Sequence, residues 1–160
     1  MPPRDDARRS KQPVVVDSSV AAKWVFPEPL SGEALRLVVS WDEARRIVVV
    51  PPHFWVEVAN AARHKARPRA EAPAVTRREA VAALGVLRDL GLVTSHGAAS
   101  LAAPALELAL DLGLTTWDAA YLAVAESVGA EFWTADRDLA RRARRRFPWV
   151  RLLAEADTDH

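Results

Sequence analysis

Four acidic residues in apolar surroundings hold most of the chemistry that this sequence offers. They are Asp17, Glu57, Asp118 and Asp136, in the contexts VVVD, FWVEVAN, TWDAAY and FWTAD. A charged carboxylate is costly in an apolar setting unless it has a partner or a metal. Four carboxylates that converge would repel one another strongly without a cation. Because oxygen-only ligands suit Mg²⁺ or Mn²⁺ rather than zinc or copper, the pattern predicts a hydrolytic site with a hard metal.

Three of these acids also have a simpler structural interpretation as helix-start residues. Asp17 can cap a helix, although Ser18 and Ser19 beside it could do the same. Asp118 and Asp136 each begin a helical pattern, where the helix dipole favours negative charge. Only the combination of the acids therefore argues for a function.

Capping does not explain Glu57, which lies inside a helical pattern rather than at its start. Its neighbours are largely apolar, so few directions are left for a solvated face. Asn60 and His64 follow at helical spacing and place a polar stripe on the same side. An exposed stripe is the alternative, but we favour an inward, functional Glu57 with Asn60 as a supporting residue.

Short β-branched runs alternate with helical patterns along the chain, which predicts an α/β fold with a parallel sheet. These strands and helices must position the acids. Expected strands are 14–16, 47–50, 92–94, 130–134 and 149–153. Expected helices begin at Ser18 or Ser19 and stop by Pro27, then cover about 30–46, 53–67, 76–90, 98–112, 117–128 and 136–146. Functional residues of such sheets gather beyond the carboxyl ends of the strands. Asp17 and Asp136 are expected at such ends, with Glu57 and Asp118 on helices over the same edge.

Composition bounds the class of protein. The 160 residues are 50% hydrophobic and 27% charged, which fits one domain that buries roughly 70% of its unfolded surface. A formal net charge of +1 means that any nucleic acid must be held by local basic clusters. The lack of cysteine excludes disulfides and cysteine-ligated metals and agrees with a cytoplasmic protein. No apolar run reaches the ~18 residues needed to cross a bilayer, so no membrane association is expected.

The domain is expected to span residues 13–153. Residues 1–12 lack the apolar core of a secretory signal and are interpreted as a disordered extension. Residues 154–160 are interpreted as a flexible C-terminal tail. The extension carries a basic patch of Arg4, Arg8, Arg9 and Lys11, to which we assign no role.

Four motifs, taken in order, resemble the PIN-domain family and, within it, the VapC-type toxins of type II toxin–antitoxin systems. They are VVDSSV, EVANA, LTTWDAAYLA and TADRDL, at residues 15–20, 57–61, 114–123 and 134–139. The resemblance implies a three-layer α/β/α sandwich with a central, mainly parallel sheet of four to five strands. It also implies an Mg²⁺-dependent endoribonuclease, with Mn²⁺ able to substitute, and an adjacent antitoxin of the VapB type. A homodimer is expected on the same ground.

Carried over by position, Asp17, Glu57, Asp118 and Asp136 form the acidic quartet of that family. Ser18 and Thr134 fall where the family often has a supporting hydroxyl, and Asp138 is a possible further acid. The N-terminal extension is the main departure from the family pattern.

Basic side chains for an RNA backbone are expected on the helix that carries Glu57 or on the final helix, with Arg63, Arg67, Arg137 and Arg141 as the chosen candidates. Lys65, Arg69, Arg144 and Arg145 belong to the same runs. A solvated helix face explains these charges about as well. His53, His64 and His96 have no metal-ligand spacing, and none is assigned to catalysis. Large apolar residues of the first half (Trp24, Phe26, Leu30, Trp41 and Trp55) are interpreted mostly as core, a few as groove or interface.

Two other classes remain as alternatives. A phosphoacceptor signalling domain also uses acids, Mg²⁺ and a parallel sheet, but Asp17 is followed by serines and Lys65 is the last lysine. A catalytically silent module could use the same fold to bind a partner. A DNA-directed nuclease is a closer alternative within the enzyme class. The sequence does not distinguish transfer, ribosomal and messenger RNA as the substrate.

Overall fold

A computed structural model describes residues 12–67, 75–95 and 97–158. Its centre is a five-stranded sheet in the order β3-β2-β1-β4-β5, in which every neighbouring pair is parallel. The strands are β1 Val14–Val16, β2 Val48–Val50, β3 Val93–Thr94, β4 Glu131–Thr134 and β5 Val150–Leu152. This arrangement confirms the expected α/β class and parallel sheet.

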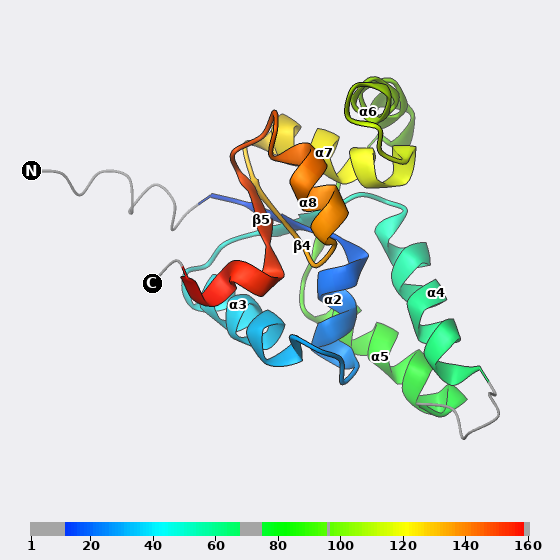
Figure 1. Ribbon diagram of the computed structural model, residues 1–160. Helices are drawn as coiled ribbons and strands as arrows, with labels where there is room; N and C mark the ends of the chain where they lie inside the picture. The colour runs from blue at the N-terminus through cyan, green and yellow to red at the C-terminus, as the bar shows by residue number, and fades with distance from the viewer. Residues whose placement is uncertain (1–11, 68–74, 96, 159–160) are drawn as a thin grey trace, which may run out of the picture.

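Helices cover both faces of the sheet, as Figure 1 shows. They are α2 Ser18–Val25, α3 Ser31–Glu43, α4 Phe54–Ala66, α5 Arg77–Asp89, α6 Ala98–Leu112, α7 Thr116–Val128 and α8 Arg137–Ala143. Right-handed crossovers with this strand order place α2 to α5 on one face and α6 to α8 on the other. The three-layer α/β/α sandwich is therefore confirmed.

The chain direction across the sheet reverses between β1 and β4. From β1 the chain proceeds outward through β2 to β3, and it then returns to β4 on the other side of β1. Such a switch point leaves a crevice beyond the carboxyl ends of the two central strands, where open α/β sheets bind their ligands. Asp17 directly follows β1 and Asp136 lies two residues beyond β4. The topology thus brings the first and last acids to one edge.

The core is built around strands whose side chains are buried on both faces. All three valines of β1 are fully buried, which explains the unbroken apolar run in the sequence. Trp41 packs between Trp24 and Trp133, with ring centroids 6.3 and 6.0 Å away. Trp24, Phe26 and Trp41 are buried, so the interpretation of the large apolar residues as mostly core is confirmed for these three.

Several helix ends follow from local sequence chemistry. Thr76 and Glu79 form the expected capping box at the start of α5. Gly113 and Gly129 end α6 and α7 in the left-handed region, both with φ of 65°. The second helix ends at Glu43, earlier than the expected residue 46, because Arg45 adopts a left-handed φ of 54° that cannot continue a helix.

The end of the chain differs from the expected flexible tail. Leu153–Thr158 form a 3₁₀ helix, η1. Leu153 is fully buried, Ala156 is 9% exposed and both join the main core cluster. Glu155 pairs with Arg144 at 2.7 Å. Burial of two apolar side chains and this ion pair hold the segment against the core, so the described domain extends to Thr158.

Some expectations fall outside the described residues. These are the extension at residues 1–11 with its basic patch, the polar break at 68–73 with Arg69, and His96 and residues 159–160. Within the described ranges, no single helix is long and apolar enough to cross a membrane. The helices α6 and α7 meet that criterion only together, across a bend of 113°.

Candidate metal centre at the carboxyl edge of the sheet

Asp17 is the buried centre of the site. Its side chain caps α2: Oδ1 accepts hydrogen bonds from the backbone N–H groups of Ser19 (2.9 Å) and Val20 (3.2 Å) and from the Ser19 hydroxyl. Oδ2 accepts from the Thr134 hydroxyl. Burial nevertheless raises the pKa of Asp17 to about 6, against the lowering effect of these bonds. An acid kept in so unfavourable a place is typical of a functional site.

Two hydroxyls join the end of β1 to the end of β4. The Thr134 oxygen accepts from the backbone N–H of Asp136 at 3.0 Å while its proton goes to Asp17. The Ser19 oxygen accepts from the backbone N–H of Ala135, also at 3.0 Å. Thr134, expected as a supporting hydroxyl, thus contacts Asp17 directly. Ser19, which the sequence analysis considered only as a cap, contacts Asp17 directly, whereas no such contact is recorded for Ser18 in the described structure.

Glu57 lies in the first turn of α4 and faces α7. Its Oε2 accepts a hydrogen bond from the hydroxyl of Tyr121 and lies 4.0 Å from His53 Nε2. Its side chain is 30% exposed, so it reaches both the interior and solvent. The inward orientation that we favoured agrees with this contact. Asn60, one turn further along α4, is exposed.

Asp118 lies in the first turn of α7 and is partly buried. Its backbone N–H donates to Thr115 Oγ1 at 3.1 Å, and the same hydroxyl donates to its Oδ2 at 2.7 Å. Thr115 thus caps the helix and Asp118 lies in its first turn, which agrees with the structural interpretation of Asp118 as a helix-start residue. The contact engages one carboxylate oxygen with a short, neutral side chain, so the charge of Asp118 is not neutralised by it.

Asp136 caps α8 in the same way that Asp17 caps α2. Its Oδ1 accepts from the backbone N–H groups of Asp138 (2.8 Å) and Leu139 (3.0 Å), but its side chain is exposed. Asp138 instead pairs with Arg141 and with Arg142, the latter at 2.7 Å. Hydrogen bonds to these arginines lower the pKa of Asp138. The carboxylate of Asp138 is thus paired with two arginines on the exposed face of α8, without a metal.

The charge of Glu57 acts on two neighbouring aromatic side chains, Tyr121 and His53, while Asp17 acts on the first and Asp118 on the second. Burial, then the hydrogen bond and charge of Glu57 and the charge of Asp17, raise the pKa of Tyr121 and keep it protonated. Burial lowers the pKa of His53, opposed by the charges of Glu57 and Asp118. The charges of Asp17, Glu57 and Asp118 are thus linked through Tyr121 and His53, and the Thr134 hydroxyl joins Asp17 to the backbone of Asp136.

The donor chemistry at this edge of the sheet fits a hard cation, because it consists of carboxylate and hydroxyl oxygens. In the present conformation, no group of three or more His, Asp or Glu side chains within residues 12–67, 75–95 and 97–158 is arranged to hold a metal ion. Asp17 is fixed by the fold, while Asp136 is exposed and Glu57 and Asp118 are partly exposed. The acids gather at one edge without closing around a single point.

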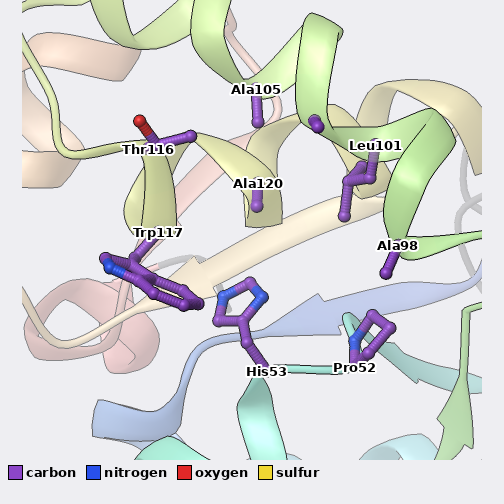
Figure 2. Close-up of a pocket in the computed structure, with 9 residues that line it drawn as sticks. Pro52, His53, Ala98, Leu101, Ala105, Thr116, Trp117 and Ala120 are labelled. Carbon is purple, nitrogen blue, oxygen red and sulfur yellow. The ribbon is translucent and has the colours of Figure 1, made fainter.

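An apolar pocket of about 550 Å³ is lined in part by His53, whose Nε2 lies 4.0 Å from Glu57 Oε2. Figure 2 shows His53 and Trp117 side by side at one end of it, with Leu101 and the alanines of α6 and α7 as the other wall. The two rings are 5.1 Å apart, and Trp117 is 62% exposed. His53 Nε2 is buried without a hydrogen-bond partner in the described structure. No role is expected for His53 from the sequence, although its position four residues before Glu57 on a helix is a signal for their proximity.

The candidate RNA-binding arginines lie on the surface. Arg63 and Arg67 are exposed on the second half of α4, and Arg137 is exposed at the start of α8. Arg141 is exposed but bound to Asp138. Lys65 is engaged elsewhere, 2.6 Å from Glu28.

The structure is a doubly wound α/β sheet with acidic residues at its switch point. The chain belongs to the PIN-domain family, whose model matches residues 14–145. Ribonuclease VapC3 of Pyrobaculum aerophilum is 33% identical over 133 residues, which cover 81% of this chain and 93% of that protein. Within the family, the chain is therefore similar to the VapC-type proteins, as the sequence motifs indicated.

Two solved structures share the fold. PAE2754 from Pyrobaculum aerophilum superposes with a TM-score of 0.59 at 24% identity, over 82% of this chain and 79% of its own. VapC20 of Mycobacterium tuberculosis, described as a toxin that cleaves the sarcin–ricin loop, gives a TM-score of 0.60 at 22% identity, over 80% of this chain and 93% of its own. At these identities the likeness establishes the fold alone.

Proposed function

We propose that this protein is an Mg²⁺-dependent endoribonuclease and the toxin of a VapBC-type toxin–antitoxin pair, acting in the cytoplasm. The observation that carries the proposal is Asp17, a buried carboxylate at the switch point whose pKa is raised to about 6. Family membership and the relative named a ribonuclease support the same activity.

Asp17 and Asp136 are our choice of direct metal ligands, and Glu57 and Asp118 would bind directly or through water. Thr134 and Ser19 hold the Asp17 carboxylate in place. Mg²⁺, or Mn²⁺ in its place, would supply a water activated at neutral pH and would stabilise charge on the leaving oxygen.

The expected reaction is attack of water on phosphorus with cleavage of the bond to the 3′ oxygen, which leaves a 5′-phosphate and a 3′-hydroxyl. Arg63, Arg67, Arg137 and Arg141 are proposed to hold the RNA backbone. Because Arg141 already pairs with Asp138, its contribution would require that ion pair to open. The ribose 2′-hydroxyl takes no part in this chemistry, so the products distinguish it from metal-independent ribonucleases.

The test is cleavage of an end-labelled RNA by purified protein free of antitoxin, with Mg²⁺, with Mn²⁺ and with EDTA. Asp17→Asn protein purified in the same way controls for contaminating ribonucleases. We expect metal-dependent products with 5′-phosphate ends. Ends with a 2′,3′-cyclic phosphate, or cleavage undiminished by EDTA, would contradict the mechanism. Cleavage of single-stranded DNA but not RNA would favour a DNA-directed nuclease, and no cleavage would favour the silent module.

A phosphoacceptor domain is disfavoured by the surroundings of the lysines. Such a domain needs a lysine near its buried aspartate, but both described lysines, Lys23 and Lys65, pair with Glu28, at 2.9 and 2.6 Å. Asp17 is itself enclosed by four hydrogen bonds from the protein.

A VapB-type antitoxin and a second copy of the chain are the proposed protein partners. Large apolar side chains are exposed on α6 and at the start of α7, with Leu106, Leu110 and Trp117 at 51%, 75% and 62% exposure. Exposed apolar groups of this size support protein contacts. The mass of the purified protein by light scattering tests the dimer, and co-purification with the product of the neighbouring gene tests the antitoxin.

A further inference from the structure

Tyr121 is a buried polar residue to which the proposed reaction gives no role. It is 1% exposed, in the middle of α7. Its ring stacks on Phe132 with centroids 5.9 Å apart and meets the edge of His53 at 4.9 Å. With the ring held on two sides, the hydroxyl has little freedom of position. It donates to Glu57 Oε2, and Ser18 hydrogen-bonds to the same phenol oxygen.

Glu57 is much less constrained than its partner. A glutamate has three side-chain torsions, and this one is 30% exposed in the first turn of a surface helix. The contact to Tyr121 joins α4 to α7 across 64 residues of sequence. His53 Nε2 lies 4.0 Å from the same oxygen but makes no hydrogen bond to it. The tyrosine hydroxyl is thus the anchor that the described structure provides for this carboxylate.

We propose that Tyr121 is a positioning residue, whose hydroxyl holds Glu57 toward Asp17 and so prepares the acid site for its metal. The inference rests on the proposed function, since it assigns Tyr121 to the same site. A partner that orients a metal-binding carboxylate typically contributes 10–100-fold to metal affinity or activity. The competing explanation is structural: the hydroxyl merely finds a hydrogen-bond acceptor at the end of a buried ring.

Tyr121→Phe separates these explanations, because it keeps the ring and removes only the hydroxyl. We expect Mn²⁺ affinity, measured by calorimetry without RNA, to fall about 10–100-fold. With Mg²⁺ and RNA, we expect kcat to fall by a similar factor while KM for RNA changes little. A matched control is Ser127→Ala, which removes a hydroxyl at the far end of α7 that donates to Val124 O at 2.8 Å. The control should bind Mn²⁺ like the wild type.

A double-mutant cycle tests whether Tyr121 acts through Glu57. If it does, Tyr121→Phe should cause no further loss of Mn²⁺ affinity in the Glu57→Gln background. An equal loss in both backgrounds would overturn the proposed route. Unchanged Mn²⁺ affinity and kcat in Tyr121→Phe would overturn the inference while leaving the ribonuclease intact. A wild-type protein that neither binds Mn²⁺ nor cleaves RNA would overturn the proposed function and the inference with it.

A second measurement does not depend on the folding of Tyr121→Phe. Tyr121 is the only tyrosine of the chain, so 3-fluorotyrosine labels this position alone. We expect Mg²⁺ to shift its ¹⁹F resonance in the wild-type sequence and to leave it in place in Glu57→Gln. A wild-type resonance that does not respond to saturating Mg²⁺ would contradict the proposal.

Discussion

The junctions β1–α2 and β4–α8 are built alike, yet they place their aspartates in different environments. Asp17 and Asp136 both follow a central strand, and each caps a helix by accepting two backbone N–H groups. Asp17 is 6% exposed and its pKa is raised to about 6, whereas Asp136 is exposed. Because capping is the same in both, it does not account for keeping a carboxylate buried at Asp17. The metal binding that we propose for the two residues together would account for it.

The largest expected effect is a loss of catalysis, and it should follow from replacing the aspartate of either junction. Asn keeps a side-chain oxygen for the cap but removes the charge. Since partners of a metal ligand already contribute 10–100-fold, loss of a direct ligand should lower kcat/KM by at least about 100-fold in Asp17→Asn and in Asp136→Asn. Single-turnover cleavage of labelled RNA in Mg²⁺ measures this. Asp136→Asn with wild-type activity would remove Asp136 from the site and reduce it to a cap.

The effect of the same substitutions on stability should differ between the two junctions, and at Asp17 it should be a gain. The folded pKa of Asp17 lies above its ordinary value of 3.8, so the fold favours the neutral form. The resulting penalty is absent below about pH 4, grows between about pH 4 and 6 and is complete above. Without divalent metal, Asp17→Asn should therefore raise the free energy of unfolding by about 2–3 kcal/mol at pH 7.5. Asp136→Asn should leave it unchanged.

Urea unfolding at both pH values checks this expectation. The gain in Asp17→Asn over the wild type should disappear near pH 4. It should also shrink when Mg²⁺ is added, because bound Mg²⁺ stabilises the wild type. A gain of the same size at pH 4 and pH 7.5 would show that the ionisation of Asp17 is not its cause.

A smaller effect should come from the cap of α8. Asp136→Ala removes the acceptor for the Asp138 and Leu139 N–H groups, which costs about 1 kcal/mol at a typical N-cap. Thermal unfolding of the Ala and Asn variants side by side measures the cap separately from the charge. Equal stability of the two variants would mean that these bonds contribute nothing measurable.

The smallest effect is expected for Asp138, although it lies two residues from Asp136. Its carboxylate is bound by Arg141 and Arg142 on the outside of α8. Asp138→Asn should therefore leave kcat/KM for RNA within about twofold of wild type, a change under ~0.5 kcal/mol. A loss comparable to that of Asp136→Asn would instead place Asp138 among the metal ligands.

Much of this fold could be predicted from the sequence because its signals are local. The valine runs mark buried strands, Thr76 and Glu79 mark a capping box, and Gly113 marks a helix end. The positions of Asp17 and Asp136 at strand ends followed from the same patterns. The spacing of Asp138, Arg141 and Arg142 also allows their ion pairs to be expected on a helix.

Other features depend on packing between distant segments. Ser18 and Ser19 are equivalent by sequence, and only the approach of β4 to β1 selects the Ser19 hydroxyl as the bridge to Ala135. The contact between Tyr121 and Glu57 joins two helices that cover opposite faces of the sheet, so it depends on how the whole fold places α4 and α7. The different burial of Asp17 and Asp136 arises in the same way, since their local patterns match.

The central claim is that Asp17 and Asp136 bind one metal across the switch point. Anomalous diffraction from crystals soaked in Mn²⁺ tests it most directly. We expect a peak about 2.1 Å from a carboxylate oxygen of Asp17, with Asp136 in the same coordination sphere and Glu57 or Asp118 bound directly or through water. A peak remote from Asp17, or none at saturating Mn²⁺ in crystals of protein that cleaves RNA, would contradict the account.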